Sequence, residues 1–321
     1  MKVSVIIPAF NAMRWLPETL ISAVAEAGPE VEVVLVDDGS TDGTADYVRQ
    51  RFPQVRVTSS SNQGCSAARS LGFAQARGEL IKFLDADDLL LPGIIGRQRQ
   101  LARDTGAEVI YGNWRRIEEK HGRWVATEEV CRRIEEVDAD DEIAFLKGMW
   151  CPTGAYLWRS DFLRVRHPGW HKRLPVIQDA RFPLDAAASG ARFVHDPVVG
   201  VHYRVHQAGS VSTRSRLTFL RDCQVSLLEI EARWAESKDS WAIRRDALLQ
   251  AWGGLVRASY AVDAALFTEC WEHLQMLAPG YLPGGGRGFR ALSRLLGYRA
   301  AEAASQWWHR GRRFCGRLPQ R

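Results

Sequence analysis

The stretch that decides the fold is "LIKFLDADDLLLP" (Leu80–Pro92), which places three aspartates between two apolar runs. The first run is mostly apolar and has the length of a short buried strand. Asp85, Asp87 and Asp88 follow it directly. Because carboxylates repel one another and resist burial, acids at the end of a buried strand need a compensating partner. A cation, a ligand or the N-terminus of a helix would serve.

The sequence before this stretch predicts a parallel sheet. Residues 2–10 and 31–38 are nearly continuous apolar runs rich in β-branched residues, which is typical of parallel strands covered on both faces. Residues 15–27 and 65–78 have helical spacing. This alternation predicts an α/β fold with a doubly wound, Rossmann-like, mostly parallel sheet flanked by helices and joined by right-handed crossovers.

The remaining segments have weaker patterns. We expect a helix from about Leu89 to Ala107, a solvated loop and a helix start in the charged region 115–147, and a pair of strands within 193–206. Amphipathic patterns without strand signals between Leu217 and Leu277 predict a helical appendage.

Composition indicates an intracellular globular protein. The chain has 321 residues, 46% of them hydrophobic, and its six cysteines form no CxxC pair. That cysteine usage favours free thiols in a reducing compartment over disulfides or zinc. No signal peptide is recognisable, and no run approaches the roughly 20 apolar residues of a membrane helix.

Three polar clusters follow predicted strands, at residues 8–11, 37–44 and 85–88. In open parallel sheets, ligands bind outside the carboxyl ends of the strands. The clusters are therefore expected to converge in one crevice.

The cluster "DDGSTDGT" also resembles the start of a calcium loop. That pattern requires Glu at the twelfth position, where this chain has Arg49, and a helix rather than a strand before the loop. Ser40 and Asp42 are equally explained as turn-capping residues, whereas Asp37 and Asp38 stand at the strand end and favour a ligand role. The cluster lacks the glycine-rich dinucleotide and P-loop patterns.

The cluster "DADD" offers hard oxygen ligands. Mg²⁺ is usually held by one or two carboxylates together with substrate phosphates, and Asp85 and Asp87 suit that role. Asp88 is predicted to cap the helix that follows.

The motifs at residues 3–12, 33–44, 62–88 and 175–190 occur in an order that resembles the family 2 glycosyltransferases. The resemblance covers about residues 2–212 and implies the nucleotide-sugar fold called GT-A. It predicts a GT-A catalytic domain at residues 1–212, with a nucleotide-sugar half at about 1–112 and an acceptor half at about 113–212. A helical appendage at 213–280 and a basic amphipathic tail at 281–321 are expected to follow.

The same resemblance implies residue roles. Pro8, Ala9 and Phe10 would border the nucleobase, Asp38 would hydrogen-bond a uracil-like base edge, Arg69 would lie near the nucleotide, and Asp85 would contact the ribose or the metal's shell. Asp87 would bind a divalent metal, Mg²⁺ or Mn²⁺, which His206 would also approach, and Asp179 would be the general base.

The implied reaction is transfer from a nucleotide-diphosphate sugar, a UDP-sugar by resemblance, to a hydroxyl acceptor in the assembly of a cell-surface glycan such as lipopolysaccharide, capsule or exopolysaccharide. One base opposite the leaving group gives inversion, and the metal offsets charge on the diphosphate. Gln178 stands where such enzymes commonly have Glu, which affects the tuning of Asp179. A sugar nucleotidyltransferase and a non-catalytic nucleotide- or glycan-binding protein remain alternatives.

The tail from Arg287 to Arg321 has nine arginines and one acid, Glu302. Phe289, Leu292 and Leu296 fall on one helical face, and Trp307 and Trp308 follow. Such a segment suits an anionic membrane surface and a lipid-linked glycan acceptor, and it predicts a cytoplasmic protein peripheral to the inner face of the plasma membrane. Nucleic-acid binding is not expected, since no motif for it is present; a packed terminal helix is the other reading.

Overall fold

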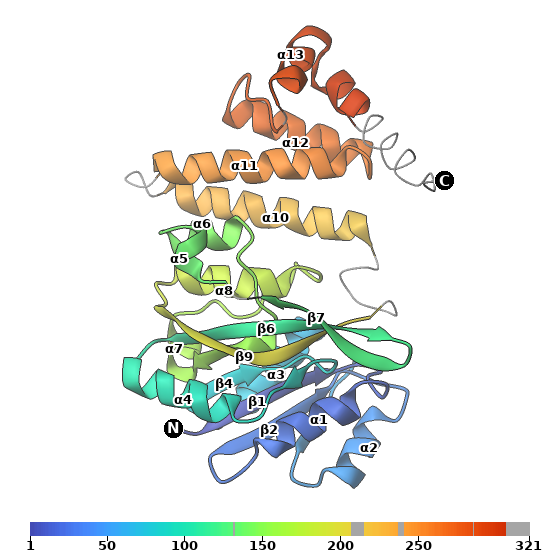
Figure 1. Ribbon diagram of the computed structural model, residues 1–321, viewed down its shortest axis with the longest axis vertical. Helices are drawn as coiled ribbons and strands as arrows, with labels where there is room; N and C mark the ends of the chain where they lie inside the picture. The colour runs from blue at the N-terminus through green and yellow to red at the C-terminus, as the bar shows by residue number, and fades with distance from the viewer. Residues whose placement is uncertain (131, 207–214, 237–240, 285, 306–321) are drawn as a thin grey trace, which may run out of the picture. The chain divides into compact units, whose positions relative to one another are not determined.

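The computed structural model describes residues 1–130, 132–206, 215–236, 241–284 and 286–305. Its contacts divide the chain into two compact units, Met1–Arg214 and Ser215–Arg321. The first contains the sheet and the second is helical (Figure 1). Residues 207–212, at the end of the stretch that the resemblance covers, and Trp307 and Trp308 of the basic tail lie outside the described residues.

The first half of unit one alternates strands and helices. Its elements are β1 (Val3–Ala9), α1 (Leu16–Ala25), β2 (Val31–Asp37), α2 (Thr44–Arg51), β3 (Arg56–Ser59), α3 (Cys65–Gln75) and β4 (Leu80–Phe83). The second half is more irregular. Its elements are β5 (Leu89–Leu90), α4 (Ile94–Thr105), β6 (Val109–Lys120), β7 (Arg123–Val130), α5 (Ile134–Val137), α6 (Asp141–Leu146), the 3₁₀ helix η1 (Thr153–Ala155), β8 (Tyr156–Arg159), α7 (Ser160–Val165), α8 (Gln178–Ala188) and β9 (Phe193–Val205).

Within the described residues, the strands form one mixed sheet in the order β3-β2-β1-β4-β8-β6-β9-β5, with β7 paired to β6. Strands β3, β2, β1 and β4 are mutually parallel. Ala9 pairs with Asp37, and Asp37 pairs with Ser59. The polar residues after these strands are consequently delivered to the same edge of the sheet, as ligand sites in parallel sheets require.

The centre of the sheet is largely apolar, but it includes Lys82 on β4, whose side chain is fully buried. Its Nζ donates to Gln98 Oε1 at 2.7 Å and to the Tyr156 carbonyl at 3.2 Å. Gln98 on α4 in turn donates to the Ala155 carbonyl at 3.0 Å. These bonds tie α4, η1 and β8 to β4, the strand that carries the aspartates.

The expectation of a loop across 115–147 is wrong for its first part, because β6 and β7 form a hairpin there (Figure 1). The charges of Arg115 and Glu129 pair across the two strands, and Ile117 turns into the core. His121 and Gly122 both have positive φ, as tight hairpin turns demand. Charge density suggested solvation, whereas the charges are in fact cross-strand partners.

Two further predictions need correction. Residues 193–205 are a single strand, β9, whose parallel register with β6 shifts between Gly112 and Trp114. The helix expected from Leu89 begins only at Ile94. Leu89 and Leu90 instead pair with β9 as β5, and Gly93, with φ of 79°, is the residue before the helix.

Unit two contains α10 (Arg216–Ala235), α11 (Trp241–Ser259), α12 (Ala264–Leu277) and α13 (Arg287–Leu296). Its core includes Trp234, Trp252 and Leu274. None of the helices that could be described combines the length and the apolarity needed to span a membrane.

Candidate functional site

Four aspartates gather at the carboxyl edge of the sheet, and we call Asp85, Asp87, Asp88 and Asp179 the acidic cluster. Three follow β4 and the fourth lies in the first turn of α8. Burial, and then the charges of Asp87 and Asp85, raise the pKa of Asp88 well above its usual value. Asp179 joins this edge from a distant part of the chain, and its charge interacts with that of Asp85.

Arg69 on α3 brings a cation to this cluster. It is 2% exposed and forms an ion pair with Asp85. Its guanidinium lies 4.4 Å from the centre of the Trp170 ring. Nε and one terminal nitrogen are buried without a hydrogen-bond partner among the described residues. Unpaired buried donors are costly, so this arginine is suited to an anionic ligand.

Asp87 contacts His206, the residue that follows β9. His206 Nε2 lies 2.9 Å from Asp87 Oδ2, and its ring stacks on Trp15 with centroids 5.0 Å apart. The structure thus brings together the two residues that the resemblance assigned to a metal.

Asp88 does not cap a helix, contrary to the sequence prediction. Its Oδ1 accepts a hydrogen bond from the backbone N–H of Arg204 at 3.0 Å, and its Oδ2 is buried without a partner in the described residues. The helix it was expected to cap starts six residues later, after β5 and the turn at Gly93. Asp88 therefore anchors β9 to residues 85–88, which we call the acidic loop.

Arg204 is a residue that sequence reasoning missed. Its guanidinium is fully buried, forms an ion pair with Glu18 and donates to the carbonyls of Trp15 and Asp87 at 3.4 and 3.2 Å. Burial lowers its pKa to about 10. It thereby fixes α1, the acidic loop and β9 together, and its only sequence signal was its position two residues before His206.

Asp179 lies at the start of α8, half-buried. Trp150 Nε1 donates to its Oδ2 at 3.0 Å, and the Ala180 N–H donates to its Oδ1 at 3.0 Å. Burial raises the pKa of Asp179, against the opposing effects of Arg69 and the Trp150 hydrogen bond. A raised pKa keeps a carboxylate basic enough to accept a proton near neutral pH.

Gln178 links the site's two helices. Its Oε1 accepts from Ser66 on α3 at 2.8 Å, and its Nε2 donates to the Pro175 carbonyl at 3.3 Å. A glutamate could not donate that second bond. The neutral amide therefore holds the start of α8 without adding charge beside Asp179.

The predicted nucleobase residues divide into two groups. Pro8 and Ala9 are buried in β1, whereas Phe10 is 45% exposed at the strand end. Asp38 is buried, and its two oxygens accept from the backbone N–H groups of Gln63 and Gly64 at 2.9 and 2.7 Å. Asp38 thus shapes the loop before α3 and retains acceptor capacity for a further donor.

The cluster around Ser40 and Asp42 has the turn-capping role. Ser40 Oγ accepts from the Asn11 N–H at 2.9 Å, and Asp42 Oδ2 accepts from the Met13 N–H at 3.1 Å. Asn11 Oδ1 accepts from the Thr41 N–H at 2.8 Å. These bonds hold the loop that leads from β1 past Phe10.

The acidic cluster suits a divalent cation that a substrate would help to bind. Among the described residues, no group of three or more His, Cys, Asp or Glu side chains is arranged to hold a metal alone. Asp87 is nevertheless partly exposed beside three other acids, and Asp88 keeps an unpartnered oxygen. Carboxylate oxygens plus phosphate oxygens are the usual ligands of Mg²⁺, so Asp87 and Asp85 fit this group.

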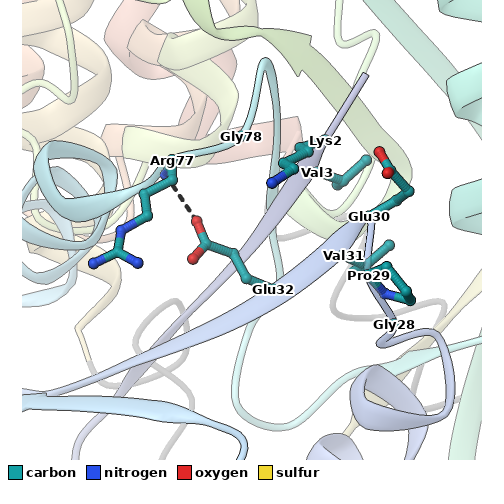
Figure 2. A pocket seen from close by; sticks show the side chains of 9 residues that line it. All are labelled: Lys2, Val3, Gly28, Pro29, Glu30, Val31, Glu32, Arg77 and Gly78. Atoms are coloured by element: carbon teal, nitrogen blue, oxygen red, sulfur yellow. Dashed lines mark hydrogen bonds between the residues drawn. The ribbon is translucent and has the colours of Figure 1, made fainter.

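Two surface pockets lie at the opposite edge of the sheet. One is bordered by Val3, Val31 and Gly78, at the amino ends of three parallel strands, and Glu32 there accepts from the Arg77 N–H at 2.7 Å (Figure 2).

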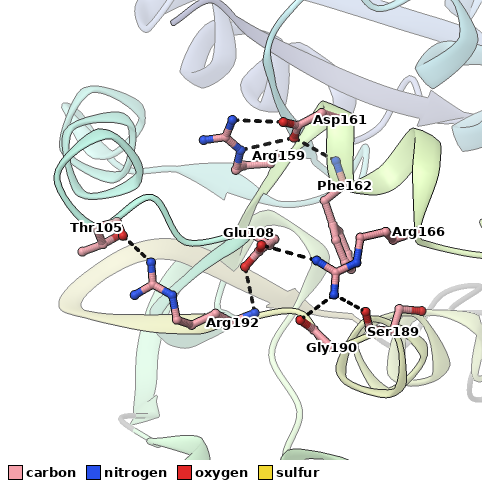
Figure 3. Close-up of polar contacts among 9 residues, drawn as sticks. All are labelled: Thr105, Glu108, Arg159, Asp161, Phe162, Arg166, Ser189, Gly190 and Arg192. Carbon is pink, nitrogen blue, oxygen red and sulfur yellow. Dashed lines mark hydrogen bonds and ion pairs between the residues drawn. The ribbon is translucent and has the colours of Figure 1, made fainter.

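The second pocket includes Glu108 and Arg166, which form an ion pair (Figure 3). Arg166 also donates to the Gly190 carbonyl at 2.9 Å, and Arg192 donates its backbone N–H to Glu108 at 3.0 Å. The charged side chains of the second pocket thus satisfy one another.

The sequence comparisons agree with the resemblance. The sequence model of the family described as "Glycosyl transferase family 2" matches residues 4–164. An uncharacterized glycosyltransferase of Nostoc is 30% identical over 181 residues, covering 52% of this chain and 54% of that protein. Glycosyltransferase GlyG of Streptococcus pneumoniae is 29% identical over 155 residues, covering 46% and 51%. The chain thus spans about half the length of these relatives.

Solved structures support the fold. The S. aureus TarS fragment 1–349 in complex with UDP-GlcNAc has a TM-score of 0.62 at 19% identity, covering 96% of this chain and 92% of that one. Mannosyltransferase PcManGT of Pyrobaculum calidifontis, in complex with GDP-Man and Mn²⁺, has a TM-score of 0.52 at 18% identity, covering 96% and 87%. The predicted GT-A fold class is confirmed. By its family match and its fold, this chain belongs to glycosyl transferase family 2.

Proposed function

We propose that this chain is an inverting, divalent-metal-dependent glycosyltransferase. It would move a sugar from a nucleotide-diphosphate sugar to a hydroxyl acceptor in the assembly of a cell-surface glycan. The observation that carries the proposal is that Asp87, Arg69 and Asp179, which come from three separate elements, gather at one edge of the sheet. This arrangement offers a metal ligand, an anion partner and a base within one cluster.

Donor binding is assigned to the residues around Arg69. The two unpartnered nitrogens of its guanidinium suit the negatively charged diphosphate. Phe10 is exposed beside the loop that Asp38 shapes, which suits a stacked nucleobase. Asp85, held by Arg69, would face the ribose. We propose a UDP-sugar as donor; the TarS fragment was crystallised with UDP-GlcNAc and supports this choice as a fold relative.

Asp87, approached by His206, would hold Mg²⁺ or Mn²⁺ together with the donor's diphosphate. The cation would supply positive charge where the leaving phosphate develops negative charge. Arg204 holds the acidic loop through the Asp87 carbonyl, and Trp15 stacks on His206. The Asp87 carboxylate is therefore oriented before a ligand binds.

Asp179 would remove the proton from the acceptor hydroxyl as that oxygen attacks the anomeric carbon. The new bond forms on the face opposite the bond to the diphosphate, which breaks with its electron pair going to phosphate. A single displacement of this kind inverts the configuration. The raised pKa of Asp179 supports the role of base.

The test of this function compares the wild type with Asp179→Asn and with Asp161→Asn. Asp161 is an exposed acid on α7 and serves as the matched control. Transfer and donor hydrolysis are assayed with UDP-sugars in Mn²⁺ or Mg²⁺, and donor binding is followed by thermal shift. We expect Asp179→Asn to lose about 10²–10⁴-fold in turnover while still binding donor. A wild type that neither binds nor turns over any nucleotide-sugar would reject the function.

We also propose that α13 contacts an anionic membrane surface, which would place the protein at the inner face of the plasma membrane near a lipid-linked acceptor. Leu295 and Leu296 are 80% and 65% exposed at the end of α13, which also carries the exposed Arg290 and Arg294, and cations together with apolar side chains complement anionic lipid. Phe289 does not take part, because its ring packs edge-on against Tyr298.

Vesicle co-sedimentation tests the membrane contact. The double variant Leu295→Ser, Leu296→Ser is expected to lose binding to vesicles that contain phosphatidylserine. Met276→Ser, which alters an exposed apolar residue on α12, should bind as the wild type does. Equal binding to neutral vesicles, or no loss in the double variant, would contradict the proposal.

A further inference from the structure

Trp150 is held in a fixed orientation at the edge of the acidic cluster. It lies between α6 and η1, in a segment without regular structure. Its ring meets Trp114 on β6 edge-on, with centroids 5.3 Å apart and planes at 89°. It meets Tyr203 on β9 in the same way, at 5.4 Å and 77°. Two edge-to-face contacts at these distances leave the indole little freedom to rotate.

The polar end of this fixed ring points at the proposed base. Trp150 Nε1 donates to Asp179 Oδ2 at 3.0 Å. The other carboxylate oxygen accepts from the Ala180 N–H of the same helix. One oxygen is thus oriented by α8 itself and the other by a side chain anchored on β6 and β9. The remaining lone pairs of the carboxylate stay available for a proton.

We propose that Trp150 is a positioning residue for the base: its N–H fixes the Asp179 carboxylate against the acceptor and favours the ionised form. This inference rests on the proposed function of Asp179. A donor to the charged form of a carboxylate stabilises that form and lowers its pKa. The tryptophan therefore offsets part of the burial that raises the pKa of Asp179.

Among the described residues, no side chain near Asp179 other than Trp150 donates a hydrogen bond to its carboxylate. Titratable side chains near Asp179 in the described residues include Arg69 and Cys65 on α3, Asp85 after β4, Tyr156 on β8 and Tyr203 on β9. Arg69 is already paired with Asp85, and the adjacent Gln178 bonds to Ser66 and Pro175. The side-chain donor to the Asp179 carboxylate is therefore Trp150.

The neighbouring Trp114 provides a matched control. It is buried and contacts the same Trp150 and Tyr203 rings, and no hydrogen bond joins its Nε1 to Asp179 in the described residues. Replacing either tryptophan by phenylalanine removes one indole N–H and the same volume of side chain at each position. Only the Trp150 change removes a bond to Asp179.

The experiment measures kcat and KM for the donor between pH 5 and 9 in Trp150→Phe, Trp114→Phe and the wild type. We expect Trp150→Phe to lower kcat about tenfold, to leave donor KM unchanged, and to move the acid limb of the rate profile up by about one pH unit. Trp114→Phe should leave that limb in place. Trp150→His, which restores a ring N–H, should move it back toward the wild-type position.

Trp150→Leu is made in parallel, so that poor folding of one variant does not decide the result; folding is followed by thermal unfolding. An acid limb that stays in place in a folded Trp150 variant, or that moves equally in Trp114→Phe, overturns the positioning role. That outcome leaves the proposed function intact as long as Asp179→Asn is inactive. A wild type without turnover would instead defeat the function itself.

Discussion

The buried Lys82 should make the stability of this protein rise with pH, and replacing it by methionine should remove that dependence. Burial lowers the pKa of Lys82 from the ordinary 10.5 to about 7, although the charges of Glu26 and Asp196 partly oppose the shift. Its hydrogen-bond acceptors, Gln98 Oε1 and a backbone carbonyl, are both neutral. The folded chain therefore disfavours the ammonium form.

Proton linkage sets the sign and the size of this change in the free energy of unfolding. Between pH 7 and 10 the unfolded chain keeps the Lys82 proton while the folded chain releases it, so the free energy of unfolding increases with pH in that window. Each full unit contributes about 1.4 kcal/mol. Because the folded lysine is still half protonated at pH 7, the gain from pH 7 to pH 9 is about 2 kcal/mol.

Urea unfolding of the wild type, Lys82→Met and Lys120→Met at pH 7 and pH 9 measures this term. Lys120 is an exposed lysine at the end of β6 and serves as the control. Lys82→Met should lack about 2 kcal/mol of the pH-dependent gain shown by the other two proteins. Parallel pH dependence in all three would refute the argument, because it would mean that Lys82 titrates alike in the folded and unfolded chains.

Three further outcomes are expected. Asp87→Ala should cost at least about 100-fold in turnover and abolish the response to added Mn²⁺, measured by metal titration; a variant with wild-type metal dependence would exclude Asp87 as the ligand. Gln178→Glu should place a second charge beside Asp179 and shift the acid limb of the pH–rate profile up by about one unit, whereas an unshifted limb would show that the amide's neutrality is unimportant. Arg204→Lys should lower stability by about 2 kcal/mol, because an ammonium cannot reach Glu18 and two carbonyls at once; unchanged thermal unfolding would contradict this.

The parallel part of the fold was predictable because strands that are buried on both faces have nearly continuous apolar sequences. The runs at 3–9 and 31–37 are strands β1 and β2 with nearly every residue buried. Parallel pairing then fixes where the following polar residues must go. The convergence of Asp38, Asp85 and Asp87 at one edge required only this rule.

The hairpin β6–β7 and the role of Asp88 were not predictable in the same way. A charged run such as 115–130 looks solvated until its cross-strand partners are known, as with Arg115 and Glu129. Asp88 has the composition of a helix cap, yet its partner is a backbone N–H 116 positions later. Local patterns carry no information about contacts at such separations.

The remaining site contacts depend on individual side chains. A tryptophan at position 150 is compatible with sugar stacking or core packing, but in the structure its N–H bonds to Asp179. Trp158 and Trp170 are buried in the core. Cys65 lies among the charges of Arg69, Asp85 and Asp179. Sequence spacing does not predict the orientation of these side chains or their neighbours in the fold, on which their roles depend.

The contact between Asp87 and His206 joins residues 119 positions apart, and this has a consequence during synthesis. At about 5–20 residues per second, the ribosome delivers β1 to β4 several seconds before His206 emerges. A chain terminated at residue 164, where the family match ends, carries Arg69 and the acidic loop but neither Asp179 nor His206. On the proposed roles, such a truncated product would carry Arg69 and Asp87 but neither the base nor the residues that fix the acidic loop, so the site is assembled only after residue 206 has been made.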